Sequence, residues 1–199
     1  GPFSGGAAYY RFDTNSKSHL GRIEQRFGVG EKWGIMLGYS ASDIGDIRDS
    51  GLGTMRGTGY SQISHDLKLE YALTPSQTLT LAHFHLDQND LSRWHNTIHN
   101  PGWSQGSSFT TAGTDLSRDY DQERSLTYLR FEETNANSSW IDRYQATISF
   151  QRTQDSEFRV RESGRSDTRI LDIDTFGLSL VAGTGETVWG ADYFHDQID

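Results

Sequence analysis

The sequence predicts an all-β protein that forms part of an antiparallel, up-and-down transmembrane β-barrel. Apolar and polar residues alternate with a period of two, and no segment carries a helical pattern. Short and long connections alternate between the predicted strands. No run approaches the about 18 apolar residues of a membrane helix. A strand-built membrane protein shows no such run, because its lipid-facing and lumen-facing residues alternate.

About nine strands are expected along the chain. In the clearest one, Ile63 and Leu67 occupy odd positions while Asp66 and Lys68 occupy even positions, so one face is apolar and the other charged. In another, the apolar side changes near His83, which predicts a bulge or a strand end there. The predicted strands are 7–13, 19–27, 33–40, 61–73, 78–86, 125–131, 143–151, 176–181 and 189–194.

The predicted connections differ in length according to the end of the sheet at which they lie. The short ones are 29–31, 74–76, 135–138 and 183–185, and the long ones are 42–59, 89–122 and 153–167. Segment 14–18 is short but falls on the long-loop side. Outer-membrane barrels have short periplasmic turns and longer extracellular loops, and aromatic girdles flank an apolar band about 25 Å tall. Trp140 and Phe150, ten positions apart on one predicted face, are expected to mark the two girdles.

Composition excludes several classes of protein. The net charge of −9, without a block of Lys or Arg, argues against nucleic-acid binding. The 12% aromatic content argues against disorder, and the absence of Cys excludes disulfides and thiolate metal sites. Ser64, His65 and Asp66 are adjacent strand residues that alternate between faces, so they cannot form a catalytic triad. We therefore expect neither an enzyme nor a cofactor.

Four segments resemble the barrel of TonB-dependent outer-membrane receptors. The segment 187–196 (TVWGADYFHD) is similar to a mid-barrel strand of that family, and 174–180 (DTFGLSL) to the strand before it. The segment 69–81 (LEYALTPSQTLTL) resembles a strand–turn–strand unit of the family. The segment 121–128 (DQERSLTY) is similar to a strand that returns from an extracellular loop. Their order along the chain strengthens the resemblance.

The resemblance implies a bacterial outer-membrane receptor that actively imports a small-molecule iron complex (a siderophore or haem) or a cobalamin-like nutrient. Such receptors have about 22 strands around an N-terminal plug, and the plug region contacts TonB. Residues 1–199 would then be a single partial barrel domain that begins just after the plug, with the remaining strands absent. The full-length receptor is expected to be a monomer in the lipid bilayer. Polar-face side chains would point into the lumen; they include Arg22, Glu24, Arg26, Asp66, Lys68, Glu70, Arg143 and Gln145.

Two other classes of protein remain open at this point. The first is a soluble or surface-attached β-sandwich binding module that does not transport anything. The second is an outer-membrane enzyme barrel, although no pairing of a nucleophile with a base is visible in the sequence.

Substrate contacts are expected mainly in the long 89–122 loop. Loops of this length are uncommon unless they are functional or disordered, and Trp and Arg are enriched at binding hot spots. The candidate residues are Arg93, Trp94, His95, His99 and Trp103. They could recognise an anionic or aromatic ligand, or the aromatic residues could simply pack on one another or on lipid headgroups.

Metal sites are weaker candidates. Asp43, Asp46 and Asp49 recur every third residue in a Gly-rich loop, and Ca²⁺ prefers oxygen ligands, but a solvated acidic loop explains the same pattern. The resemblance adds that calcium binds extracellular loops in the cobalamin branch of the family. Two histidine pairs could each hold a transition metal or a haem iron if a third ligand joined them; these pairs are His83 with His85 and His95 with His99.

Overall fold

The computed structural model describes residues 2–51, 53–93, 96–98, 113–136 and 140–199. These residues form a nine-stranded antiparallel sheet and one small hairpin, β4–β5. The sheet strands are β1 (Phe3–Asp13), β2 (Ser18–Val29), β3 (Trp33–Ile44), β6 (Tyr60–Thr74), β7 (Gln77–Ser92), β8 (Asp115–Glu133), β9 (Arg143–Arg161), β10 (Ser166–Thr184) and β11 (Thr187–Ile198). The hairpin strands are β4 (Arg48–Asp49) and β5 (Gly53–Thr54).

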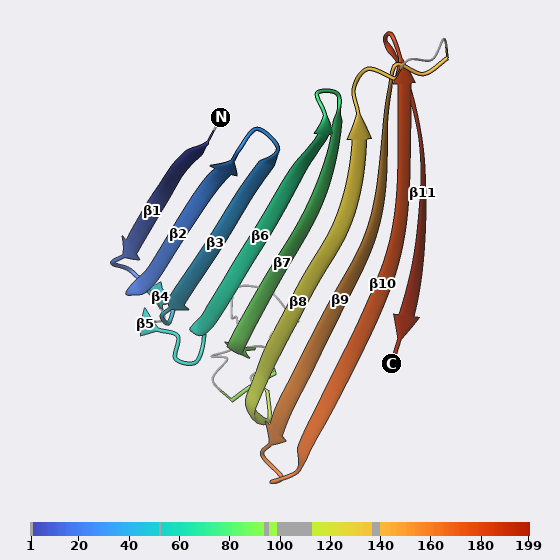
Figure 1. The fold of residues 1–199 in the computed structure, drawn as a ribbon. Helices are drawn as coiled ribbons and strands as arrows, with labels where there is room; N and C mark the ends of the chain where they lie inside the picture. Colours follow the sequence, from blue (N-terminus) through green and yellow to red (C-terminus); the bar gives the residue numbers. More distant parts are fainter. Residues whose placement is uncertain (1, 52, 94–95, 99–112, 137–139) are drawn as a thin grey trace.

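Each strand of the sheet pairs with the next one along the chain. The order is β1-β2-β3-β6-β7-β8-β9-β10-β11, and every pairing is antiparallel. Figure 1 shows the strands side by side in this order, with β1 and β11 at opposite edges. The predicted all-β class and the nine antiparallel strands are therefore confirmed, and the sheet is open rather than closed.

The connections fall at two ends of the sheet, which we call the turn end and the loop end. Connections at the turn end are 30–32, 75–76, 134–142 and 185–186; those at the loop end are 14–17, 45–59, 93–114 and 162–165. The predicted long loop 153–167 is wrong, because β9 and β10 continue to Arg161 and from Ser166. Trp140 lies in the connection before β9 rather than on the strand, so it shares no strand face with Phe150.

The register of the strands shows neither of the two predicted features, a bulge or a strand end, at His83. Pairing between β6 and β7 runs unbroken past His83. The register shifts instead near Ala72, between Gln88 and Leu91, and between Asp115 and Ser117. The apolar side changes at His83 because both faces of β7 carry apolar side chains, and not because the backbone is irregular.

The described residues form one layer without a core. Ala82 is their only buried hydrophobic residue, and none of their large side chains is fully buried. The accessible surface of 13196 Å² compares with about 9400 Å² expected for a compact monomer of 22.4 kDa. No second sheet covers either face in the described part of the chain, so the arrangement of a β-sandwich is not present there.

The two faces of the sheet differ in chemistry. Directly paired residues share a face, and one such row contains Ile35, Leu69, Leu81, Leu129, Ile148, Leu178 and Tyr193. We call this side the apolar face. The opposite side, the polar face, carries the Arg, Lys, Asp and Glu side chains of β2 and β6 that the sequence assigned to one face. The alternation predicted from the sequence is therefore present in the structure.

Aromatic side chains border the apolar face at the turn end. The rings of Trp33 and Tyr71 lie 4.4 Å apart, and those of Phe131 and Tyr144 lie 5.7 Å apart. On β6 the apolar residues run from Ile63 to Tyr71, which spans about 27 Å along the strand and about 20 Å along an axis tilted by 40°. The width is close to that of the apolar band of membrane barrels, about 25 Å.

The loop-end border of the apolar face runs diagonally across the sheet. Tyr10 on β1 connects through successive partners to Asp172 on β10. The last apolar residue of β1, Phe12, lies two positions nearer the loop end than Tyr10, whereas the apolar run of β10 begins at Phe176, four positions nearer the turn end than Asp172. The border thus shifts by about six residues over seven pairings, which corresponds to strands tilted by about 30° to the band.

Candidate functional site

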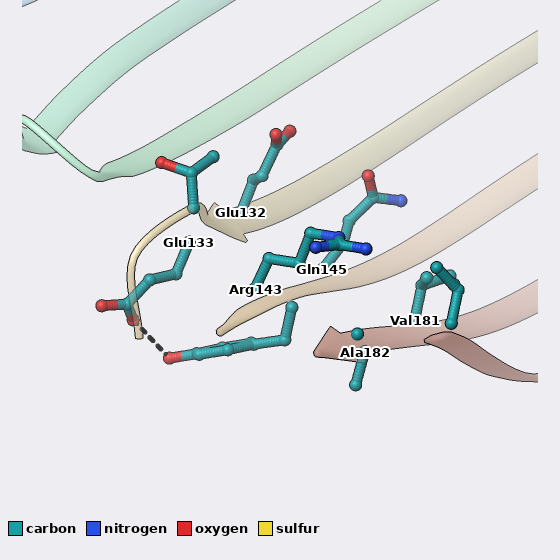
Figure 2. Close-up of a pocket in the computed structure, with 10 residues that line it drawn as sticks. Glu132, Glu133, Arg143, Gln145, Val181 and Ala182 are labelled. Atoms are coloured by element: carbon teal, nitrogen blue, oxygen red, sulfur yellow. Dashed lines mark hydrogen bonds between the residues drawn. The ribbon is translucent and has the colours of Figure 1, made fainter. Parts of the chain in front are cut away.

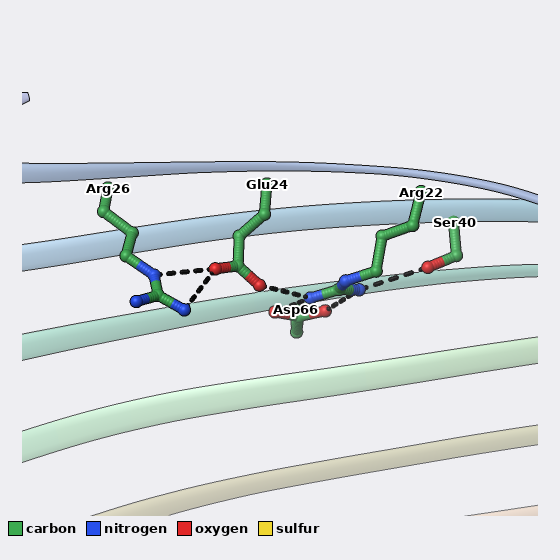
Figure 3. Close-up of polar contacts among 5 residues, drawn as sticks. All are labelled: Arg22, Glu24, Arg26, Ser40 and Asp66. Carbon is green, nitrogen blue, oxygen red and sulfur yellow. Dashed lines mark hydrogen bonds and ion pairs between the residues drawn. The ribbon is translucent and has the colours of Figure 1, made fainter. Parts of the chain in front are cut away.

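An ion-pair network lies on the polar face over β2, β3 and β6 (Figure 3). Arg22 donates two hydrogen bonds to Asp66, from Nη1 to Oδ1 (2.8 Å) and from Nη2 to Oδ2 (3.1 Å). Arg22 also donates to Ser40 Oγ (3.1 Å) and to Glu24 Oε2 (3.1 Å), and Arg26 Nε donates to Glu24 Oε1 (2.7 Å). The guanidinium of Arg22 and the carboxylate of Asp66 form a bidentate pair, which fixes both groups strongly.

This network crosses β3, which contributes the small side chain of Ser40 beside Arg22 and no side chain beside Asp66. Arg22 lies on β2 and Asp66 on β6, and β3 runs between them. Gly38 occupies the row between Glu24 and Asp66. A Cβ atom at Gly38 would lie 2.5 Å from each carboxylate oxygen of Asp66. The absence of a side chain at position 38 therefore allows the ion pair to form over β3.

A second cluster of charged residues lies at the loop end of the polar face. Arg118 Nε donates to Glu157 Oε1 at 2.7 Å, and their side chains are only 14% and 9% exposed. The guanidinium groups of Arg93 and Arg118 lie 4.7 and 5.5 Å from the centre of the Tyr120 ring. We call these four residues the arginine–tyrosine cluster. Two cations thus share one aromatic ring, and only one of them is paired with Glu157.

A β-bulge brings Arg93 into this cluster. Odd residues of β7, such as His85, lie on the apolar face, so an unbroken strand would place Arg93 there as well. The register instead shifts between Gln88 and Leu91, and Asp90 adopts a φ of 60° with its N–H donated to Asp121 Oδ1 (3.0 Å). The extra residue reverses the alternation, so that Arg93 shares the face of Tyr120 and Arg118.

Glu157 lies about seven residues beyond the apolar border of β9, where the strand extends past the band. Burial raises the pKa of its carboxyl group, but hydrogen bonds from Arg118 and Tyr120 outweigh burial, and the pKa lies below its usual value. Glu157 therefore stays ionised and balances one of the two stacked arginines.

A cavity of about 220 Å³ adjoins the arginine–tyrosine cluster. Its lining residues are Arg56, Gly57, Ser92, Arg93, Thr97, Leu116, Ser117, Arg118 and Asp119. Arg56 and Gly57 come from the connection that carries the β4–β5 hairpin, whereas the others come from the ends of β7 and β8 and the segment between them. Ser92, Ser117 and Asp119 belong to the face opposite Tyr120, whereas the guanidinium groups of Arg93 and Arg118 lie over the Tyr120 ring.

Another cavity, of about 140 Å³, lies at the turn end between β8, β9 and β10 (Figure 2). Tyr144 Oη donates to Glu133 Oε2 (2.7 Å) at its border. Arg143 Nη2 donates to the carbonyl of Gly185 (2.8 Å), and Asp142 Oδ2 accepts the Gly185 N–H (2.7 Å). These bonds tie two neighbouring connections together, and we interpret this cavity as structural.

The acidic loop residues are not gathered around a common point. Asp46 Oδ1 accepts the N–H groups of Thr58 (3.0 Å) and Gly59 (3.1 Å), which closes the 45–59 connection. Asp49 Oδ1 accepts the N–H of Gly51 (2.7 Å), and Asp43 belongs to β3, opposite His19 and Ser61. In the part of the chain that the structure describes, no group of three or more His, Asp or Glu residues could hold a metal ion.

The strand histidines cluster on the apolar face. The His65 ring stacks on that of His85 with centroids 4.7 Å apart, and the His83 centroid lies 5.9 Å from that of His65. His83 Nδ1 lies 2.8 Å from Thr127 Oγ1, so a strand neighbour already engages this ring.

Most of the predicted substrate-binding residues lie outside the described residues. These are Trp94, His95, His99 and Trp103, and the expected metal pair of His95 with His99 lies there too. Arg93 is described, and the structure places it in the arginine–tyrosine cluster.

Sequence reasoning missed Arg118, Glu157 and Asp167, because it assigned all three positions to loops. The Asp167 carboxylate forms ion pairs with Arg159, Arg161 and Arg165. Charged or polar residues recur at every second position from Glu157 to Arg161, and this alternation could have extended the predicted strand.

Comparisons of the chain with protein-family models, curated proteins and solved structures returned no match. No helix in the described part of the chain is long and apolar enough to cross a membrane.

Proposed function

We propose that this chain forms part of the wall of a bacterial outer-membrane β-barrel receptor of the TonB-dependent type, which takes up an iron complex or a similarly scarce nutrient. One observation carries the barrel-wall part of this proposal. The sheet is a single layer with one uncovered apolar face and one face of ion pairs. Such a sheet needs an apolar medium on one side and water or polar protein on the other. A barrel wall in a membrane supplies both.

Three further features support a barrel wall. The strands form a meander, as in up-and-down barrels. The apolar band is close to membrane width, and its diagonal border indicates tilted strands, as closure of a barrel requires. The two edges, at β1 and β11, would pair with further strands of the same barrel, because unpaired edges favour aggregation.

The receptor activity is supported by the sequence resemblance and by the position of the charged groups. The arginine–tyrosine cluster lies at the loop end of the polar face, where the connections 45–59 and 93–114 also lie. In an outer-membrane barrel this end faces the cell exterior, and a ligand would meet it first.

The transport activity can be tested in iron-starved cells that carry or lack the full-length protein. Uptake of radiolabelled ferric siderophores and haem should depend on the protein and should stop when the proton-motive force is collapsed. A chromosomal deletion complemented in trans provides the control. Equal uptake of every iron complex with and without the protein would contradict an iron-receptor function.

A further inference from the structure

We propose that a hollow in the middle of the polar face binds an aromatic carboxylic acid. The hollow has a volume of about 360 Å³, which falls within the range of about 300–1,000 Å³ that small-molecule sites occupy. The inference rests on the proposed function in so far as the proposed barrel keeps the polar face in contact with water.

The hollow extends across the central strands of the sheet. Three strands each contribute two residues of the polar face, which occupy neighbouring rows of directly paired positions. These residues are Ser64 and Asp66 on β6, Phe84 and Leu86 on β7, and Arg124 and Leu126 on β8. The lining residues that alternate with them along the strands, such as His85, have their side chains on the apolar face and contribute none to the hollow.

Apolar side chains form a continuous patch in this hollow. Phe84 pairs directly with Leu126, and Leu86 lies two positions from Phe84 on the same face. Phe84 is 40% exposed, and its ring lies 6.4 Å from that of Tyr128, with an interplanar angle of 24°. A contiguous apolar patch on the water-facing side of a sheet is unfavourable unless something covers it, and such patches commonly mark binding sites. A ligand that covers the patch would explain why β7 carries apolar residues on both faces.

An unpaired cation borders the apolar patch. Arg124 is exposed, lies directly opposite Leu86, and forms no ion pair or hydrogen bond with another described residue. Asp66, the one carboxylate among the described lining residues, is held by the bidentate bond from Arg22. The next carboxylate on this face, Asp155, lies one row farther toward the loop end and outside the lining. The guanidinium group of Arg124 is therefore available to an anionic group in the hollow.

The patch and the arginine together define the chemistry of the ligand. A guanidinium group presents paired N–H donors that match the two oxygen atoms of a carboxylate, and an aromatic ring favours offset stacking with another ring. An aromatic acid satisfies both groups at once. A simple anion would leave the patch uncovered, and a neutral aromatic compound would leave Arg124 without an acceptor. A membrane lipid would contact the opposite, apolar face instead.

Calorimetric titration of the purified full-length protein in a neutral detergent tests this proposal. The probe is benzoate, and its heat of dilution into detergent alone is subtracted. Saturable binding is expected. The uncharged analogue benzamide should bind about tenfold more weakly, because the charge-assisted hydrogen bonds are lost. Acetate, which carries the charge but no ring, should not displace benzoate.

Two substitutions separate the contributions of the charge and the ring. Arg124→Gln should weaken the binding of benzoate about tenfold and leave that of benzamide unchanged. Phe84→Ala should weaken the binding of both probes, because it removes the aromatic contact and not the charge. Arg124→Lys should recover only part of the affinity for benzoate, since the charge remains but the planar fork does not.

Arg11→Gln provides the matched control. Arg11 is also an exposed residue of the polar face, and it forms no ion pair or hydrogen bond elsewhere in the described part of the chain. Five strand spacings, or about 24 Å along the sheet, separate its strand β1 from β8. The control should bind benzoate as the wild type does, and circular dichroism should show that all variants are folded.

The proposal is overturned if benzoate does not bind saturably, which is also the result if another part of the full-length chain fills the hollow. Equal effects of Arg124→Gln and Arg11→Gln, equal binding of benzoate and benzamide, or unchanged binding in Phe84→Ala would overturn it as well. Failure of the receptor function is distinguishable, because cells would then show no protein-dependent iron uptake while Arg124-dependent binding of benzoate persisted.

Discussion

At the scale of single residues, a missing side chain can decide whether an interaction forms. The Arg22–Asp66 pair spans two strand spacings, and on β3 Ser40 lies beside Arg22 while Gly38 lies beside Asp66. The sequence correctly predicts that both charged residues share the polar face. It does not predict their pairing, since an alternating pattern gives no information about which non-adjacent strands come within reach.

We expect Gly38→Ala to lower the stability of the full-length protein by about 1–3 kcal/mol, because the added Cβ displaces Asp66 from Arg22. Gly34→Ala is the matched control on the same strand and face, where the nearest atom to a Cβ would be Glu70 Oε2 at 3.5 Å. Thermal unfolding of the two variants in detergent measures the difference. Equal midpoints would show that the network accommodates the methyl group.

Asp46 illustrates how a residue pattern can suggest the wrong chemistry. Its spacing from Asp43 and Asp49 suggested a calcium loop, whereas its carboxylate accepts two backbone N–H groups of the same connection. Asp, Asn and Ser side chains commonly satisfy backbone donors in this way, and no sequence spacing separates that role from metal binding.

Asp46→Ala should loosen the 45–59 connection by about 1–2 kcal/mol, whereas Asp46→Asn should largely preserve it, because the amide oxygen still accepts both hydrogen bonds. Limited proteolysis within this connection gives the measurement. Cleavage rates should not respond to added calcium or to a chelator. Calcium-dependent protection that Asp46→Asn abolishes would restore the metal hypothesis.

At the scale of the strands, alternation identified the central part of each one, and in β7, β8, β9 and β10 it missed most of the loop end. The apolar face supplies the signal only as far as the band extends, and residues such as Glu157 and Arg159 lie beyond it. There the strands are held by charge pairing instead. Asp167 contacts Arg159 (3.1 Å), Arg161 (2.7 Å) and Arg165 (3.3 Å).

The bulge at Asp90 also could not be predicted from the sequence. Asn and Asp tolerate a positive φ, so the Asn89-Asp90 pair is compatible with a bulge, but many such pairs occur in ordinary loops. Without the bulge, Arg93 would be assigned to the wrong face. The candidate site could therefore be named by residue type in part, but its geometry could not be derived.

The assignment of the faces makes a prediction for β9. Ile148→Arg, on the apolar face, should reduce assembly of the full-length protein into the membrane, at a cost of about 2–4 kcal/mol for a charge near the midplane. Gln151→Arg, three residues away on the polar face, should assemble normally. Protease-resistant protein in isolated outer membranes can be compared for the two variants. Equal loss from both would contradict the assignment of the faces.

At the scale of the whole molecule, a sheet of nine consecutive strands with 13196 Å² of accessible surface does not resemble a compact soluble domain. Its two chemically distinct faces, the diagonal border of the apolar band and the aromatic border at the turn end are the features that support our proposal of a membrane-barrel wall. Connection length separates the two ends of the sheet less clearly than the sequence predicted. The long connection 134–142 lies at the turn end, and the short connection 162–165 lies at the loop end.

Cysteine labelling in intact cells tests the proposed membrane-spanning wall most directly, because residues 1–199 contain no Cys. Ser163 and Glu186 are exposed residues in the connections at the loop end and the turn end of β10. In the full-length protein, Ser163→Cys should react with a membrane-impermeant maleimide on intact cells, and Glu186→Cys only after the outer membrane is permeabilised. Labelling of both cysteines on intact cells, or of Glu186→Cys alone, would contradict the account.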